Sequence, residues 1–125
     1  MSFVWLTEDD VEAIHDEALE SGGGAEGWLN QTHLPAALSR PKNKKVYEDA
    51  TVYECATAYV YGIAKAHAFN DGNKRTAYLS ALVFLALNGH SVNAPDKEAA
   101  EAVEFLTTGA MSEEEFSEWL RRRAS

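Results

Sequence analysis

The sequence predicts an all-α fold, a single compact bundle of about six helices around a central pair, with one small β-hairpin. Three observations indicate this class. Apolar residues recur at the three- and four-residue spacing of amphipathic helices along most of the chain. Capping residues and glycines mark where these segments begin and end. Two segments near the middle are apolar on nearly all sides, which is typical of helices at the centre of a bundle.

Length and composition fit one domain, residues 1–125. The chain is 46% hydrophobic and 25% charged, so it can bury a core without disulfides or metals. The formal net charge of -9 leaves no basic face for DNA or RNA. We therefore expect no direct nucleic-acid partner, whereas a basic protein partner would suit this charge.

Targeting signals are also missing from the pattern. The first six residues lack the basic and apolar regions of a signal peptide. The longest apolar run, residues 77–87, is shorter than the ~20 residues of a spanning helix, so we expect no membrane partner. The single cysteine, Cys55, allows no internal disulfide and fits a cytoplasmic protein. Its apolar neighbours predict a buried, inert thiol.

The first helix is expected to start at Thr7, an N-cap followed by acids, and to end at the glycines 22–24. His15 and Asp16 lie inside it. An adjacent His-Asp pair can bind metal in phosphohydrolases, but such sites need another histidine upstream. None exists in this chain, so a structural or supporting role for His15 is favoured.

Residues 22–30 predict a glycine-rich loop, followed by a short second helix that ends at Ser39-Arg40-Pro41, because helices usually stop before a proline. Residues 40–45 form the only basic cluster outside the C-terminus. It is interpreted either as a solvated loop or as a flap that approaches a nucleotide or a target chain. Val46 and Tyr47 are expected to belong to a short hairpin there.

The two central helices are expected at residues 51–66 and 76–88, both apolar nearly all round. A fifth helix is expected to start at Pro95-Asp96 and to close at Gly109. Ser112, followed by three glutamates, is a capping box for the last helix. The chain shows no repeat, linker or low-complexity segment.

The polar loop between the central helices, residues 67–76, carries the candidate chemistry. Lys74 and Arg75 fall in or near the first turn of the following helix, where the helix dipole disfavours cations. A bound anion would resolve this conflict. Helix N-terminal amides, the permissive backbone of Gly72 and the two cations together predict a nest for nucleotide phosphates.

The remaining loop residues supply what phosphate chemistry needs. Polyphosphate normally arrives with Mg²⁺, which prefers oxygen ligands, and Asp71 is the only carboxylate in the loop, although it could simply cap the helix. His67 precedes the nest and suits a general base for a hydroxyl nucleophile. Phe69 is expected to anchor the loop in the core. Asn73 would orient a phosphate oxygen or form structural hydrogen bonds.

At this point the segment His67–Arg75 resembles the signature of the Fic/Doc family, His-Pro-Phe-x-(Asp/Glu)-Gly-Asn-Gly-Arg. Ala68 replaces the proline and Lys74 the second glycine, and both departures resemble the Doc (death-on-curing) branch of toxins from toxin–antitoxin modules. Doc-like sequences often carry Arg-Asp where this chain has Trp28-Leu29-Asn30. Supporting similarity lies at Ile14-His15-Asp16, the glycine run, Ala37-Leu38-Ser39-Arg40-Pro41 and Asn88-Gly89.

The resemblance implies an all-α fold of about six helices with a small flap, and nucleotide chemistry. Most Fic proteins transfer AMP to a protein hydroxyl, whereas Doc transfers the γ-phosphate of ATP to a threonine of the elongation factor EF-Tu and halts translation. The usual partner is a Phd-type antitoxin, whose C-terminal segment folds into a groove on the toxin. ATP and Mg²⁺ are the cofactors implied.

The resemblance also implies a role for each motif residue. His67 would be the general base and Asp71 the Mg²⁺ ligand. The phosphates would be held by Gly72, Asn73, Lys74 and Arg75. Lys44, Lys45 and Val46 would lie near the flap that aligns the target segment.

Four functions compete for this sequence. Lys74 favours a Doc-like kinase, because it adds bulk and charge where glycine would leave room. AMP transfer to a protein hydroxyl is the runner-up, and a catalytically silent binding protein is the third. A metal hydrolase built on His15, His67 and Asp71 would lack enough ligands at recognised spacing.

Overall fold

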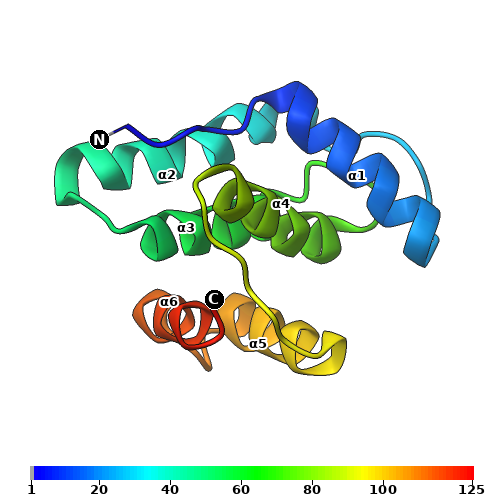
Figure 1. Cartoon of the computed structure of the whole chain (residues 1–125). Coiled ribbons are helices and arrows are strands. Elements are labelled where there is room, and N and C mark those ends of the chain that lie inside the picture. Colours follow the sequence, from blue (N-terminus) through cyan, green and yellow to red (C-terminus); the bar gives the residue numbers. More distant parts are fainter. Residues whose placement is uncertain (1) are drawn as a thin grey trace.

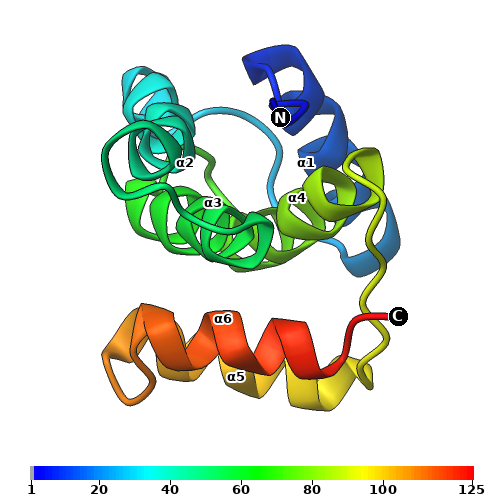
Figure 2. The ribbon, with the colours of Figure 1, turned by 60° about the vertical axis from the view of Figure 1, so that its left-hand side comes forward.

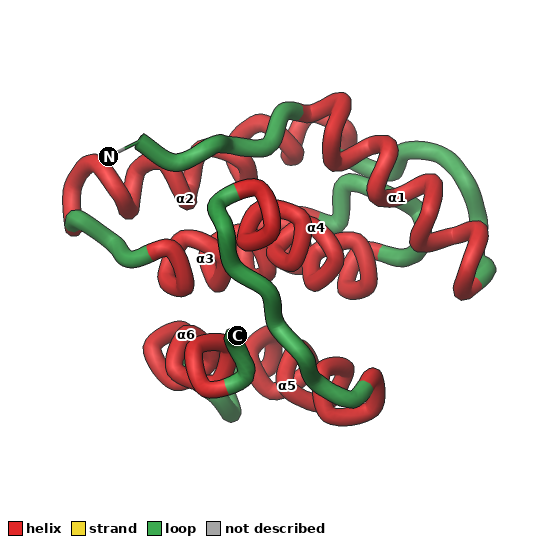
Figure 3. Tube along the Cα trace, in the orientation of Figure 1, coloured by secondary structure: helices red, strands yellow, loops and turns green. Residues whose placement is uncertain are grey.

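The structure, a computed structural model, describes residues 2–125, in which it has six α-helices, one short 3₁₀ helix and no strand (Figure 1; Figure 3). The predicted all-α class and the number of helices are therefore confirmed. No helix of this part is long and apolar enough to cross a membrane. The elements are α1 (Glu8–Gly22), η1 (Gln31–His33), α2 (Leu34–Glu48), α3 (Val52–Ala66), α4 (Asn73–Leu87), α5 (Asp96–Thr108) and α6 (Glu113–Arg122).

The helices are stacked in three layers (Figure 2). The middle layer holds α3 and α4, with α1 and α2 on one side and α5 and α6 on the other. Helix α3 packs against α2, α4, α5 and α6, and nine of its fifteen residues are buried. The two helices predicted from their all-round apolar character are thus the central pair.

Local capping chemistry starts several helices where the sequence predicts. Thr7, Thr51 and Ser112 each form a capping box, in which the side chain and the backbone of the cap bond reciprocally with the third helical residue. Helix α5 begins after Pro95, and Gly109 ends it with a φ of 88°, which glycine adopts without strain. Helix α4 begins at Asn73 rather than at residue 76.

Tyr59 and Cys55 carry titratable groups that are fully buried in the core. The hydroxyl of Tyr59 accepts a hydrogen bond from the backbone N–H of Leu6 at 3.0 Å, and burial raises its pKa to about 12. Burial likewise raises the pKa of the Cys55 thiol to about 11. Because only the thiolate is a strong nucleophile, the prediction of a buried, inert Cys55 is confirmed.

The second helix corrects the sequence prediction. Helix α2 does not end before Pro41 but continues through it to Glu48, with Pro41 buried inside the helix. Packing overrides the local rule, because α2 lies very close to α3: a Cβ on Gly62 would stand 3.1 Å from the carbonyl oxygen of Ala37. The Cys55 thiol also donates to the Pro41 carbonyl at 3.6 Å.

The prediction of a hairpin at Val46 and Tyr47 is also wrong. Because α2 continues past Pro41, both residues are helical. Lys44 and Lys45 are also helical and pair with acids: Lys44 approaches Glu113 at 3.9 Å, and Lys45 bonds Asp49 at 2.8 Å.

The Lys44–Val46 segment also lies far from the motif loop. It is adjacent to the start of α3, because the N–H of Ala50 bonds the carbonyl of Lys44. His67 lies at the other end of α3, about 20 Å away by the helical rise. This segment therefore does not flank the loop as the flap prediction requires.

Candidate active site

His67 ends α3 in an unusual backbone conformation. Its φ of 47° and ψ of 43° are left-handed, and only one other described non-glycine residue has a positive φ. Such a conformation costs about 1 kcal/mol or more outside glycine. It turns the chain sharply out of α3, and the His67 side chain is exposed. The imidazole makes no hydrogen bond with the described residues, so it is open to an incoming group.

Phe69 anchors the loop as predicted. Its ring is 1% exposed and lies between two other rings, His15 from α1 and Trp28 from the glycine-rich segment. The ring centroids are 3.8 Å apart for His15 and 4.7 Å for Trp28, with interplanar angles of 8° and 24°. The stack therefore joins three segments that are distant in the sequence.

Asn73 closes the loop on itself. Its Oδ1 accepts from the backbone N–H of Phe69 at 3.1 Å, and its Nδ2 donates to the Phe69 carbonyl at 2.9 Å. Both polar atoms of the amide are thus used for the turn. Of the two roles weighed for the Asn73 side chain, the structure supports the structural one, and a contribution to phosphate binding would come from its backbone N–H.

Asp71 has an exposed carboxylate that is only partly engaged. Its Oδ2 accepts from the backbone N–H of Ala25 at 2.8 Å, while Oδ1 has no partner among the described residues. Asp71 does not cap α4. The N-cap is Gly72, which has a φ of 77° and offers no side chain to the first amides of the helix. A Cβ at Gly72 would also stand 3.3 Å from Leu19, so the position requires glycine.

The two cations lie in the first turn of α4, as predicted, but each has a partner. Nζ of Lys74 pairs with the carboxylate of Glu104 on α5, and both side chains are about half exposed. Arg75 donates from Nη1 to the Ala18 carbonyl at 2.9 Å and from Nη2 to the Gly23 carbonyl at 2.6 Å. These carbonyls belong to the C-terminal end of α1, where the dipole favours a cation.

The set fits Mg²⁺ and nucleotide phosphate. Phosphate oxygens can bind the uncapped amides at the start of α4 and the two cations. Mg²⁺ can bind the free oxygen of the Asp71 carboxylate. In residues 2–125 no three His, Cys, Asp or Glu side chains are grouped to hold a metal. Mg²⁺ would therefore rely on Asp71 together with substrate oxygens. His15 is 3% exposed and its Nε2 lies 2.8 Å from the Asp71 carbonyl oxygen, which fits the structural or supporting role favoured from the sequence.

The glycine-rich segment pairs with the motif loop. An isolated antiparallel bridge joins Trp28 to Phe69. The N–H of Leu29 donates to the Ala68 carbonyl at 2.8 Å, and the N–H of Asn70 donates to the Gly27 carbonyl at 3.0 Å. This segment, residues 24–30, therefore lies beside the motif loop, in the place where the sequence predicted a flap formed by Lys44, Lys45 and Val46.

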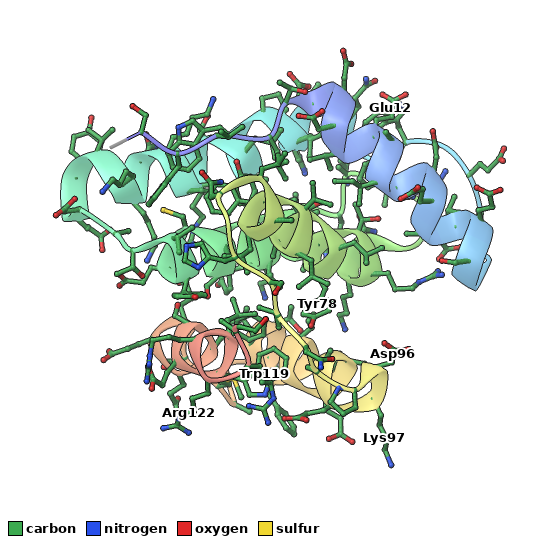
Figure 4. The ribbon with its side chains drawn as sticks, in the orientation of Figure 1. Glu12, Tyr78, Asp96, Lys97, Trp119 and Arg122 are labelled. Carbon is green, nitrogen blue, oxygen red and sulfur yellow. The ribbon has the colours of Figure 1, made fainter. Side chains whose placement is uncertain are left out.

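A groove of about 720 Å³ adjoins the same first turn of α4. Its walls come from α1, α4, α5 and residues 92–94, and they are mostly apolar. Its charged lining residues are Lys74, Arg75, Asp96 and Glu104. Tyr78 of α4 and Asp96 at the start of α5, both labelled in Figure 4, belong to this lining. Burial raises the pKa of the Tyr78 phenol, so it stays neutral.

Comparison with known proteins agrees with this geometry. Residues 5–85 match the Fic/DOC family. The chain belongs to the Fic/Doc family. Protein kinase doc of Escherichia phage P1 is 34% identical over 119 residues, which cover 94% of this chain and 93% of that protein. Toxin Doc of Mycolicibacterium smegmatis is 41% identical over 58 residues, 45% of either chain. The resemblance stated from the motif is therefore confirmed.

The Fic/Doc motif residues are brought together in one turn, which is what their spacing predicts. Sequence reasoning missed their partners from elsewhere. Trp28 and Glu104 carry no local signal, because each acts through a neighbour more than 25 positions away. For His15 the sequence favours a structural or supporting role, but it does not identify the Asp71 carbonyl as its partner. A large aromatic residue directly after Gly27, in a segment expected to be a glycine-rich loop, was the one available hint for Trp28.

Proposed function

We propose that this Fic/Doc protein is a toxin kinase that transfers the γ-phosphate of ATP to a threonine hydroxyl of EF-Tu and so inhibits translation. One observation carries the proposal: the homology to protein kinase doc extends over 94% of the chain. It is supported by the motif, in which His67, Asp71 and Arg75 are all retained and Lys74 stands where other Fic proteins have glycine.

His67 is the general base in this proposal. Its exposed imidazole accepts the proton of the threonine hydroxyl as that oxygen bonds to the γ-phosphorus, and ADP leaves. The left-handed turn at His67 supports the role, because it presents the side chain at the point where α3 gives way to the loop. Two residues further on, the stack of Phe69 with His15 and Trp28 anchors the loop that carries the base.

The first turn of α4 holds the phosphates. Backbone amides of Asn73, Lys74 and Arg75 have no side-chain cap and are available to phosphate oxygens. Arg75, held by its two bonds to the end of α1, supplies a planar guanidinium with further N–H donors, and Lys74 supplies a point charge once the nucleotide replaces Glu104 as its partner. The Asp71 carboxylate would hold Mg²⁺, which supplies positive charge to the transferring group.

Incubation of the protein with EF-Tu and ATP labelled at either the α- or the γ-phosphate tests the proposal. Label should enter EF-Tu only from the γ-position, and H67A should transfer none. Label from the α-position alone would mean AMP transfer. If neither label is transferred while expression of H67A still arrests growth, the protein is a catalytically silent binding protein.

We also propose that the groove beside Lys74 receives a Phd-type antitoxin. The mostly apolar walls suit the apolar face of an amphipathic helix, and the charged lining residues could pair with polar groups beside that face. An occupant there would lie against Lys74 and Arg75 and would restrict access to the phosphate nest.

Matched alanine-to-glutamate variants test this assignment. Ala100 is exposed on α5 and lines the groove, whereas Ala86 is exposed on α4 outside it. Ala100→Glu should weaken antitoxin binding at least tenfold and leave kinase activity intact, and Ala86→Glu should change neither. Equal antitoxin affinity of both variants and the wild type would place the antitoxin elsewhere.

A further inference from the structure

One buried polar side chain has no part in the proposed chemistry. His15 of α1 is 3% exposed, and a buried imidazole is costly unless it is hydrogen-bonded. Its bond goes to the motif loop: Nε2 lies 2.8 Å from the carbonyl oxygen of Asp71. Because a carbonyl only accepts, Nε2 carries the proton and donates it.

The same ring also holds the other end of the turn. It lies flat on Phe69, with centroids 3.8 Å apart and the planes 8° from parallel. A single side chain from α1 thus contacts both Phe69 and Asp71, more than 50 residues away in sequence. The ring also lies beside the N-cap of α4, since a Cβ on Gly72 would be in van der Waals contact with the imidazole Cδ2 at 3.7 Å.

We propose that His15 is a positioning residue for the motif loop, which fixes the backbone of Asp71 and thereby the location of its carboxylate. It acts through Asp71 and Phe69 and touches neither substrate nor metal. The effect of His15 on Mg²⁺ affinity rests on the proposed function. Its contacts with Asp71 and Phe69, which fix the backbone of the turn, do not depend on that function. Hydrogen-bonded neighbours of ligand residues typically contribute about tenfold or more to metal affinity.

Three variants separate positioning from simple core filling. His15→Phe keeps an aromatic ring against Phe69 and removes the donor to Asp71. His15→Gln removes the ring but keeps an N–H donor of similar reach. Val11→Ala is the control, because Val11 is fully buried on the same helix, one turn before His15. It lowers the melting temperature through lost packing without removing a bond to the loop.

The first measurement is the Mg²⁺ concentration that gives half-maximal ATP binding. His15→Phe should raise it about tenfold, His15→Gln should recover part of that loss, and Val11→Ala should leave it unchanged. The second is hydrogen exchange of the amides at residues 68–72 without nucleotide, which should accelerate in His15→Phe more than in Val11→Ala.

The outcomes are distinguishable. If His15→Phe matches the wild type in both measurements, or if Val11→Ala changes both as much as His15→Phe does, His15 is a core residue only and the inference fails. If the wild-type protein does not bind Mg²⁺-ATP but exchange at 68–72 still accelerates in His15→Phe alone, the proposed kinase function fails while the hold of His15 on the turn stands.

Discussion

The guanidinium of Arg75 lies so close to the backbone of Gly22 that a Cβ on this glycine would stand 1.7 Å from Nη1. Gly22 is the last residue of α1, and its neighbours Ala18 and Gly23 accept the two hydrogen bonds of Arg75. The glycine run after α1 therefore does more than end a helix. It leaves the space in which a motif residue is held.

Replacing Gly22 with alanine should separate the function of Arg75 from the stability of the fold. Alanine is the better helix former by about 1 kcal/mol, so the melting temperature should not fall. The methyl group would displace the guanidinium, and the Kd for ATP should rise about tenfold, as expected for a lost charged contact. Calorimetric titration of Gly22→Ala measures this. In an Arg75→Ala background the same change should have no further effect.

Trp28 should matter for both stability and activity. Its ring stacks on Phe69, and its segment pairs with the loop. Trp28→Ala should cost about 1–3 kcal/mol of unfolding free energy, since the side chain is half-buried, and should reduce γ-phosphate transfer through a looser loop. The neighbouring Leu29 is 60% exposed, so Leu29→Ala is the control and should change unfolding in denaturant little. Equal effects of the two variants would contradict this role.

Glu104 should oppose phosphate binding. It pairs with Lys74 and adds a negative charge beside the nest. Two charges about 6 Å apart in water interact with roughly 0.7 kcal/mol, or about threefold in affinity. Glu104→Gln should therefore lower the Kd for ATP about threefold at low salt, and less at high salt. Glu101→Gln, with the same change of net charge one turn earlier on α5, should not. If Glu104→Gln and Glu101→Gln change the Kd for ATP equally, the Lys74–Glu104 ion pair has no specific effect on phosphate binding.

The pairing of Arg40 with Glu113 should make stability depend on pH. Two hydrogen bonds of 2.5 and 2.8 Å join them, and the Arg40 guanidinium holds the pKa of Glu113 below its usual range. A lowered folded-state pKa stabilises the protein above the unfolded pKa of about 4.5, and that contribution is lost as the pH falls through the folded pKa.

Glu113→Gln should thus cost about 1–2 kcal/mol at pH 7 and progressively less below pH 4.5. Urea unfolding at several pH values measures it, with the exposed Glu114→Gln as control. A cost for Glu113→Gln that is the same at pH 3 and pH 7 would show that the ion pair does not contribute.

Much of the fold follows from local signals. The caps at Thr7 and Ser112 and the glycine at 109 act within a few residues, so their effects can be predicted without the tertiary structure. The same holds for the loop between α3 and α4. Its functional residues are adjacent in sequence, and a turn between two helices necessarily brings them together.

What could not be predicted depends on contacts between distant segments. A proline inside α2 is tolerated because α3 packs closely against the helix, and no local rule contains that information. The partners of Lys74 and Arg75 are likewise set by how α5 and the end of α1 approach α4. The conflict between these cations and the helix dipole predicts a bound anion, but protein groups already relieve part of it.

The decisive measurement of EF-Tu kinase activity is the mass of EF-Tu after incubation with the protein and Mg²⁺-ATP. EF-Tu should gain one phosphate, located on a threonine by fragmentation, and H67A should add none. An AMP adduct on EF-Tu, or phosphate added equally by the wild type and H67A, would contradict this activity.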